Sequence, residues 1–385
     1  MSEINSSNFK KEHGDLAPDL VGVTELTSPY FFVPPSGNSA ERPENCEPGT
    51  LRFNTDHGTL EVYRGDIIGW EQIQRRDGQY LGGGTGSNTG TGTRMCVLGG
   101  YTGAVVDTID FITLSTFGNA EDFGDLNSIA YSAGAIGNST RGFKLGGYTP
   151  GVSNSVNVFT FASKGDAVDS VNLSTVTAYP GECSNEIRGL IAGNSHPGAS
   201  NQIQFIELSL NNNALDFGDL SYTTLAPASC ASSTRGIFCG GQTPSNAVNK
   251  IEFVIIMTKG DYTDFGDMTS VREQHMACSN STRGLLSGGK APSMTNAIDF
   301  ITMASTGNAI DFGDMTFSNN RDGASGSSKT RGIVGAGGDP GASPYSKTDT
   351  INSVEIATTG DAEDFGDLTS ARNHMAGCSN GHGGL

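Results

Sequence analysis

Apolar and polar side chains alternate in short segments along most of the chain. Residues 251–255 and 296–303 carry apolar side chains at about every second position, a period that is typical of β-strands with one buried face. Gly-Asn or Gly-Asp pairs follow such segments and supply residues that tolerate positive φ, as hairpin turns require. No segment has a helical period, so the pattern predicts an all-β protein. The turn pairs begin at Gly118, Gly260, Gly307 and Gly360.

Two markers repeat along the chain with the same period. The tetrapeptide Asp-Phe-Gly-Asp occurs five times, and Asp-Ser-Val-Asn at residues 169–172 is a decayed sixth copy; their spacings are 47, 47, 48, 47 and 53 residues. An arginine, often preceded by Ser-Thr and followed by Gly, recurs independently every 47 or 48 residues. Together the markers define six repeats. The register arginines are Arg94, Arg141, Arg188, Arg235, Arg283 and Arg331, and the motif phenylalanines are Phe123, Phe217, Phe265, Phe312 and Phe365.

Each repeat is predicted to form four short strands. An apolar strand follows the arginine and ends on a glycine pair; an alternating strand, the Gly-Asx turn, the Asp-Phe-Gly-Asp strand and a strand of small residues come next. Four strands in a period near 47 residues are typical of a propeller blade. The sequence therefore predicts a six-bladed β-propeller over residues 94–385.

The ends of this region predict how the ring closes. The first repeat begins at Arg94 without an innermost strand of its own, and residues 371–380 form such a strand with no outer strands after it. An unpaired strand on each side of the gap would expose backbone hydrogen-bonding groups. We therefore expect residues 371–380 to pair antiparallel with residues 94–100.

The layout of the repeat resembles the kelch repeat. The resemblance implies a propeller architecture and says little about activity, because propellers support many functions. Phenylalanine stands where kelch repeats carry tryptophan. The residues that match are the diglycine Gly240-Gly241, the outer-strand aromatic Phe265, and the Arg and His that follow it, which are Arg272 with His275 and again Arg372 with His374.

The N-terminal quarter divides into three predicted parts. Residues 1–47 are polar and proline-containing and are expected to form an extended arm. Residues 48–76 contain two alternating strands around the turn Asp56-His57-Gly58 and are expected to form a β-hairpin module. Residues 77–93 are a glycine-rich linker. An isolated hairpin buries little apolar surface, so we expect its aromatic side chains to anchor the protein to partners. These side chains are Phe53, Tyr63 and Trp70.

Composition and charge exclude several classes of partner. The chain has a net charge of −18 and no cluster of Lys and Arg, which disfavours nucleic acid as a partner. No apolar run approaches the roughly 20 residues of a membrane helix, and no signal peptide core is present, so we expect neither membrane insertion nor export. The cysteines are expected to be small buried side chains in a reducing compartment.

Several residue sets have both a chemical and a structural interpretation. The paired Asp residues of each motif could coordinate Ca²⁺, but we expect one Asp to accept backbone N–H bonds while the Phe fills the core between blades. The register arginines could bind acidic glycans, but we expect them to contact the motif carboxylates. His275 and His374 are expected to share one register. No catalytic constellation is found, so we expect no enzymatic activity and no cofactor.

Two further resemblances concern function. The segment Thr-Leu-Arg-Phe-Asn-Thr-Asp-x-Gly-x-Leu-Glu-Val-Tyr at residues 50–63 resembles a segment found near the N-termini of tailed-phage fibre and virion proteins. The repeats look like those of structural proteins of phages that infect marine bacteria, cyanobacteria especially. The resemblances imply a virion protein of the tail fibre, or a tail- or head-associated type, assembled in the host cytoplasm.

The implied partners are other proteins of the tail or capsid, further copies of the chain (a trimer, for example), and a host surface glycan or protein. An alternative is a carbohydrate-binding or carbohydrate-active propeller that acts on surface glycans. A cytosolic adaptor of the kelch type is a third possibility, which the phage-like N-terminal segment disfavours.

Overall fold

The chain forms two compact units, which divide between Ser87 and Asn88. The computed structural model describes residues 35–43, 46–56, 59–65, 69–72, 93–290, 292–318, 323–338 and 346–385. Nearly all of the predicted linker and most of the predicted arm lie outside these residues. The described part of the chain is all-β, with seven four-stranded sheets and no α-helix. It contains no helix long and apolar enough to cross a membrane.

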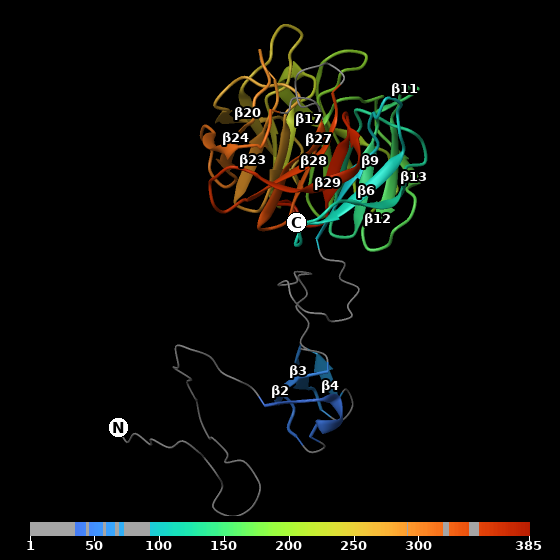
Figure 1. Ribbon diagram of the computed structural model, residues 1–385, viewed down its shortest axis with the longest axis vertical. Helices are drawn as coiled ribbons and strands as arrows, with labels where there is room; N and C mark the ends of the chain where they lie inside the picture. Colours follow the sequence, from blue (N-terminus) through green and yellow to red (C-terminus); the bar gives the residue numbers. More distant parts are fainter. Residues whose placement is uncertain are drawn as a thin grey trace, which may run out of the picture. The chain divides into compact units, whose positions relative to one another are not determined.

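The first unit is a small mixed sheet (Figure 1, blue). Its central pair, β2 and β3, is antiparallel, as the hairpin pattern predicts, with Leu51 opposite Val62. The tip of this hairpin, His57-Gly58, lies outside the described residues. The fourth strand continues the sheet beyond β3. The strands are β1 (Ser36–Gly37), β2 (Leu51–Asn54), β3 (Thr59–Tyr63) and β4 (Trp70–Gln72).

The first unit begins earlier in the chain than the sequence suggested. Strand β1 pairs parallel with β2, so part of the predicted arm belongs to the sheet and the boundary at residue 48 is wrong. A buried carboxylate explains why this part of the predicted arm packs against the sheet. Glu61 is fully buried and accepts hydrogen bonds from Arg42 Nε at 3.1 Å and Asn54 Nδ2 at 2.7 Å. Arg42 thereby lowers the pKa of Glu61, and this pairing holds residues near 42 against the sheet.

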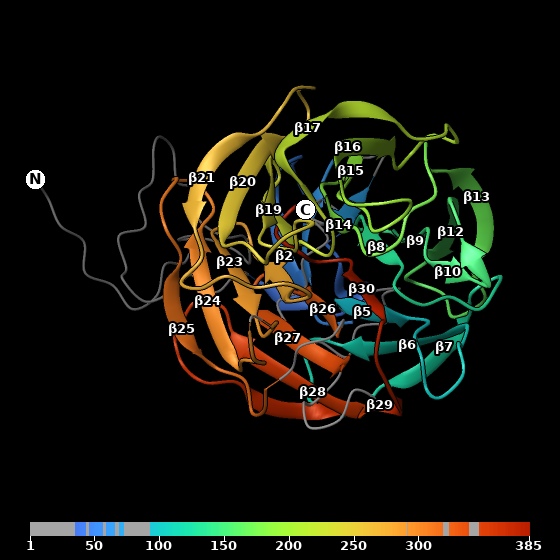
Figure 2. The ribbon, with the colours of Figure 1, turned by 90° about the horizontal axis from the view of Figure 1, so that it is seen from above.

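The second unit consists of six four-stranded antiparallel sheets, which Figure 2 shows around one central axis. The innermost strands contact one another in the cyclic order β30, β8, β14, β18, β22, β26 and back to β30. This arrangement is consistent with a β-propeller. A short ribbon of β10 (Tyr148–Thr149) and β11 (Gly151–Val152) lies within the second sheet's loops.

Each of the six sheets runs from an innermost strand near the axis to an outermost strand. The first three are β30 (Ala376–Ser379), β5 (Arg94–Leu98), β6 (Thr108–Thr113) and β7 (Glu121–Asp125); β8 (Gly134–Gly137), β9 (Arg141–Leu145), β12 (Ser155–Thr160) and β13 (Val168–Asn172); and β14 (Gly181–Ser184), β15 (Arg188–Ala192), β16 (Ser200–Glu207) and β17 (Leu215–Thr224). The last three are β18 (Ala228–Ala231), β19 (Arg235–Cys239), β20 (Lys250–Ile255) and β21 (Thr263–Asp267); β22 (Met276–Ser279), β23 (Arg283–Ser287), β24 (Ala297–Thr302) and β25 (Ile310–Asp314); and β26 (Ala324–Ser327), β27 (Arg331–Gly338), β28 (Thr348–Glu355) and β29 (Glu363–Arg372).

The C-terminal strand completes the first sheet, as the sequence predicted, but the pairing is shorter than expected: it covers Ala376–Ser379, and residues 371–372 belong to β29 of the sixth sheet. Strand β30 pairs antiparallel with β5, with Cys378 opposite Cys96. An ion pair strengthens the same junction: Arg372 Nη2 lies 2.6 Å from Asp110 Oδ2 of the first sheet, and both side chains are fully buried. Arg272 and Asp299 form the equivalent pair between the fourth and fifth sheets at 2.7 Å. The arginine of the kelch-like pattern thus joins consecutive sheets.

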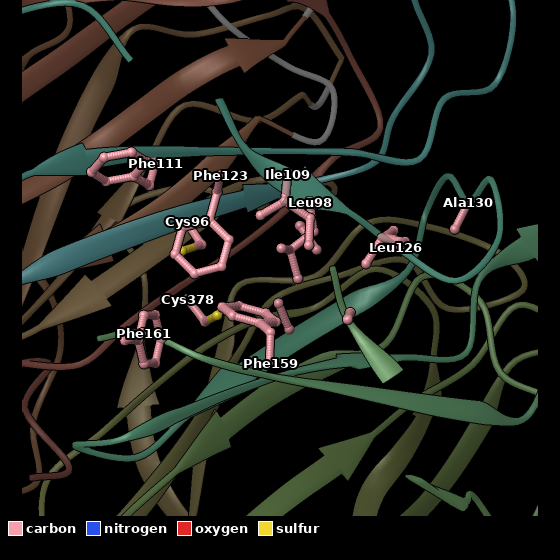
Figure 3. Packing of buried hydrophobic residues seen from close by; sticks show 13 residues of the cluster. Cys96, Leu98, Ile109, Phe111, Phe123, Leu126, Ala130, Phe159, Phe161 and Cys378 are labelled. Atoms are coloured by element: carbon pink, nitrogen blue, oxygen red, sulfur yellow. The ribbon is translucent and has the colours of Figure 1, made fainter. Parts of the chain in front are cut away.

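The motif phenylalanines pack between consecutive sheets, as expected. Phe123 of β7 lies edge-on to Phe159 of the second sheet, with ring centroids 5.4 Å apart, and also contacts Phe111 of its own sheet. Figure 3 shows these rings with Cys96 and Cys378 in one buried cluster. All five motif phenylalanines are only 2–3% exposed.

The Asp-Phe-Gly-Asp strand is hydrogen-bonded to the Gly-Asx turn of the following sheet. The N–H of Asp267 donates to Asn308 Oδ1 at 3.0 Å, and the N–H of Gly307 donates to the carbonyl of Phe265 at 2.7 Å. The same bond joins Asp367 to Asn119, which closes the ring. The side chain that accepts backbone N–H is therefore that of the turn residue, where we had expected a motif Asp.

The motif glycine is required by the close approach of this turn. Gly266 has φ of +147°, and a Cβ there would lie 2.5 Å from the carbonyl oxygen of Gly307. The decayed copy departs on both sides of the contact, with Val171 in the motif and Asn212 in the facing turn. There the Asn172 N–H still donates to Asn213 Oδ1 at 3.0 Å. Because both residues of this contact differ from those in the other repeats, the motif residue and the facing turn residue are consistent with being matched in shape.

The register arginines also join consecutive sheets, but they do not bind the motif carboxylates as expected. Arg235 Nη1 donates to the carbonyl of Met303 at 3.0 Å, and its guanidinium lies 4.6 Å from the ring centroid of Phe253. Arg331 donates to the carbonyl of Leu114 in the first sheet. All six arginines bind carbonyls of the following sheet in this way. A guanidinium presents several donors in a planar fork, which suits a carbonyl beside an aromatic face.

Deletion of residues 371–385 is expected to destabilise the entire second unit, because it removes β30 and the Arg372–Asp110 pair together. The truncated chain should unfold in one cooperative transition at a clearly lower temperature than the full chain, as measured by circular dichroism. Melting within about two degrees of the full chain, a difference of less than about 1 kcal/mol, would contradict this account of closure.

Replacement of the motif glycine should cost more than replacement of the turn glycine. Gly266→Ala and Gly260→Ala introduce the same side chain at φ of +147° and +151°, but nothing lies within 4 Å of a Cβ at Gly260. We expect Gly266→Ala to lower the free energy of unfolding by about 1–3 kcal/mol more than Gly260→Ala, measured by urea denaturation. Equal losses would show that the turn does not approach the motif as described.

Candidate functional site

The six innermost strands enclose a cavity of about 140 Å³. Small residues line most of it, because six strands meet at the axis. Serine hydroxyls among them donate to carbonyls of the preceding inner strand, as in Ser229 to Glu182 at 2.7 Å and Ser279 to Ala231 at 2.7 Å. The described lining contains no Lys or Arg and a single carboxylate, Glu182. Much of the polar lining is therefore used to join strands.

The two ends of the cavity differ. At the end where the inner strands finish, His382 Nε2 lies 2.9 Å from the carbonyl oxygen of Gly137, and Gly383 N–H donates to the carbonyl of Ser279 at 2.7 Å. The residues before the inner strands surround the opposite end, which we call the mouth. Ser132, Tyr179 and Gln274 contribute to its lining.

A ring of main-chain hydrogen bonds surrounds the mouth. Four of these bonds lie within the described residues, and in each of them a residue donates its N–H to the carbonyl of its counterpart in the preceding sheet, as in Tyr179 to Ser132 at 3.0 Å and Ser132 to His374 at 2.9 Å. All five described members have positive φ, between 49° and 57°; the sixth position lies outside the described residues. The members are Ser132, Tyr179, Ala226, Gln274 and His374.

Aromatic side chains gather on one side of this ring and form what we call the mouth cluster: Tyr131, Tyr148, Tyr179, His374 and, at its edge, His196. Tyr131 and Tyr148 stack with centroids 4.9 Å apart and an interplanar angle of 18°. His374 lies edge-on to Tyr131 at 6.0 Å and to Tyr179 at 5.9 Å. Its Nδ1 is 3.4 Å from Tyr179 Oη and from Ser132 Oγ. The four inner rings are partly exposed and His196 is exposed.

His275 and His374 do not share a register, contrary to expectation. His374 occupies the positive-φ position that Gln274 occupies in its own repeat, so His275 is equivalent to Met375. His275 is buried, and neither ring nitrogen has a hydrogen-bond partner within the described part of the chain. Burial, assisted by nearby Arg272, lowers the pKa of His275 to about 3. This histidine is therefore neutral and has the place of an apolar residue.

The proposed anchoring residues differ in exposure. Tyr63 is only 7% exposed and packs against Trp70, with ring centroids 5.5 Å apart. The small sheet therefore buries Tyr63 itself, contrary to the expectation for an isolated hairpin; Phe53 and Trp70 are partly exposed. Among the described residues of this unit, Leu51 and Leu60 are the large apolar side chains classed as exposed, at 46% and 39%.

The cysteines serve packing between sheets. All seven are free and six are buried. The Sγ of Cys183 lies so close to Gly236 of the following sheet that a Cβ there would be 2.9 Å away, and Cys230 and Cys278 face Gly284 and Gly332 in the same way. Equivalent cysteines thus contact different neighbours, as the repeat predicted. Burial raises the pKa of the Cys230 thiol to about 12, which suppresses its reactivity.

Within the described residues, no group of three or more His, Cys, Asp and Glu side chains is arranged to hold a metal ion. Neither a protein-family model nor a curated protein sequence matches the chain.

The mouth cluster was not predicted from the sequence. Its five members come from five separate connections between the strands of the sheets, and only the closed ring brings His374 beside Tyr131. A signal was nevertheless present, because tyrosines at 131, 148 and 179 break the otherwise polar or small composition of the loops before and after the glycine pairs. Comparison of the repeats position by position would have detected it.

The free energy of unfolding should depend less on pH when His275 is replaced by Met, the residue at the equivalent position 375. The unfolded histidine binds a proton below pH 6.5 and the folded one only near pH 3, so stability is lost as pH falls between these values. The loss reaches at most about 1.4 kcal/mol per pH unit. Urea denaturation between the two pKa values should show a smaller decline for His275→Met than for the unchanged chain. Parallel declines would contradict the buried, neutral histidine.

Proposed function

We propose that the chain is a structural protein of a tailed-phage virion. In this proposal the first unit attaches to the particle, and the second is a six-bladed kelch-like β-propeller, closed by β30, that docks to another virion protein or binds a host receptor. The role is non-enzymatic and requires no cofactor. Its partners are proteins of the tail or capsid and further copies of the chain.

The observation that carries the proposal is the division of the chain. The segment that resembles virion proteins folds into a sheet of its own, held by Glu61 and Arg42, and is separate from the ring of sheets. A small unit with exposed leucines suits attachment, because exposed apolar side chains favour burial against a partner. A ring held by bonds between all its sheets suits presentation of a rigid surface.

The propeller assignment rests on three features of the second unit. Its sheets have four strands each, their inner strands contact one another in a closed cycle, and the Arg272–Asp299 and Arg372–Asp110 pairs join consecutive sheets. These features support blades of the kelch type with phenylalanine in place of tryptophan.

A carbohydrate-binding or carbohydrate-active propeller is the second candidate. The mouth cluster favours it, because partly exposed tyrosine rings beside hydrogen-bonding groups suit a sugar. Binding is compatible with the first proposal, whereas cleavage is not. Release of reducing ends from purified host polysaccharide would favour the carbohydrate-active candidate.

Attachment through the first unit predicts that a fragment of residues 90–385 folds as a monomer but does not join phage particles. The tagged full chain, produced in infected cells, should be found by mass spectrometry in the density-gradient fraction that contains particles, and the tagged fragment should not. A full chain with Leu51→Ser and Leu60→Ser should be incorporated less while its melting temperature is unchanged. Incorporation of the fragment at the level of the full chain would refute attachment through this unit.

A further inference from the structure

We propose that the mouth cluster binds a neutral sugar residue of a glycan through the exposed parts of Tyr131, Tyr148 and Tyr179, with His374 and Ser132 at its edge. The inference deepens the proposed receptor-binding function and rests on it to the extent that the glycan belongs to the host surface. Sugar binding itself is a separate property of the mouth.

The scaffold does not need aromatic side chains at these positions. Tyr131 and Tyr148 form a main-chain bridge that recurs between Asn373 and Tyr101, between Leu225 and Gln242, and between Glu273 and Lys290. Two of these four bridges contain no tyrosine, and only the bridge of Tyr131 with Tyr148 has a tyrosine on both sides. Since the fold places the same backbone around the axis with other side chains, the tyrosines of one side are not explained by folding.

The backbone at the mouth has the same unusual conformation at all five described positions. Tyr179 and His374 adopt φ of 55° and 57°, at positions where Ser132, Ala226 and Gln274 stand in other repeats. Positive φ is disfavoured for residues other than glycine and is uncommon for bulky ones. Strained backbone of this kind persists where the surrounding structure compensates for it, and it occurs often at functional sites. The ring of main-chain bonds provides that compensation here.

The chemistry of the cluster fits a neutral sugar. Aromatic rings offer apolar faces to the C–H groups of a pyranose, while tyrosine and serine hydroxyls and an imidazole nitrogen exchange hydrogen bonds with its hydroxyls. Centroid distances of 4.9–6.5 Å show that the rings pack against one another, which makes a platform and leaves no cage for a cation. Neither the mouth cluster nor the described cavity lining contains Lys or Arg, so an acidic sugar or a phosphate would receive no counter-charge from these residues.

The cavity below the mouth limits what can enter it. Its volume of about 140 Å³ is well below the roughly 300–1,000 Å³ of pockets that enclose drug-sized ligands. A single sugar-sized group at the mouth fits this space better than an oligosaccharide that enters the axis. We therefore assign the site to a terminal residue or a single branch of a glycan.

Saturation-transfer NMR on the full chain tests the assignment. The probes are the methyl glycosides of glucose, galactose, mannose, fucose, N-acetylglucosamine and N-acetylgalactosamine at millimolar concentration, with glucuronic acid as the charged comparison. At least one neutral glycoside should receive saturation from aromatic protons, and glucuronic acid should receive little. Transfer to none of the neutral glycosides, or stronger transfer to glucuronic acid, would overturn the proposal.

Variants that carry the residue of another repeat at the equivalent position separate an effect on sugar binding from an effect on folding. Tyr148→Gln and Tyr131→Leu introduce the side chains of Gln242 and Leu225 and should keep the melting temperature while weakening binding about tenfold or more, equivalent to about 1.4 kcal/mol. Tyr262→Gln removes an exposed tyrosine from an outer turn and should leave binding unchanged. If all three variants weakened sugar binding equally, or if none of them weakened it, the assignment of the site would be overturned.

Failure of the sugar site can be distinguished from failure of the proposed virion role. Sugar binding by a chain that is absent from phage particles would support the site and refute the virion role. Presence in particles without transfer to any neutral glycoside would support the virion role and refute the site.

Discussion

Each sheet of the second unit has faces and polar groups that only the neighbouring sheets can cover. Hydrogen bonds between neighbouring sheets satisfy these polar groups near the axis, farther out and at the periphery. Near the axis, the hydroxyl of Ser279 donates to the preceding inner strand. Farther out, Thr269 donates its N–H and hydroxyl to Asp299 of the following sheet. At the periphery, the Gly-Asx turn binds the Asp-Phe-Gly-Asp strand. Because unpaired buried polar groups are costly, these bonds account for the serine, threonine, aspartate and glycine that recur at these positions in several of the repeats.

Packing between sheets obeys a matching constraint on size. Where the register arginine is followed by glycine, the inner strand of the preceding sheet presents a larger residue, such as Cys278 against Gly332. In the first repeat Met95 follows the arginine, and there the inner strand presents Gly326, which a Cβ would bring within 2.9 Å of the methionine. The large residue and the glycine have thus exchanged sheets at this junction. The closing junction, which joins the two ends of the ring, therefore also packs one large side chain against a glycine.

The side chains at the mouth are not needed to hold the ring together. Main-chain hydrogen bonds hold its rim, so its side chains can vary from repeat to repeat without loss of the ring. Ser, Tyr, Ala, Gln and His accordingly occupy one equivalent position. A repeated scaffold with an asymmetric rim is a physical basis for specific binding, because the invariant bonds provide stability and the variable side chains provide chemistry.

The sequence by itself determined the four strands of each repeat, the repeats, the buried phenylalanines and the pairing of β30 with β5, because these depend on local periods and on the order of segments along the chain. It did not determine the partners of side chains that reach into another repeat. The register arginines bind carbonyls, the turn residue accepts the N–H that was assigned to a motif Asp, and Glu61 draws Arg42 into the first sheet. The mouth cluster is the clearest case. Tyr131 and His374 are separated by 243 positions, and only closure of the ring makes them neighbours, because a contact between distant loops depends on the tertiary arrangement and leaves no local period.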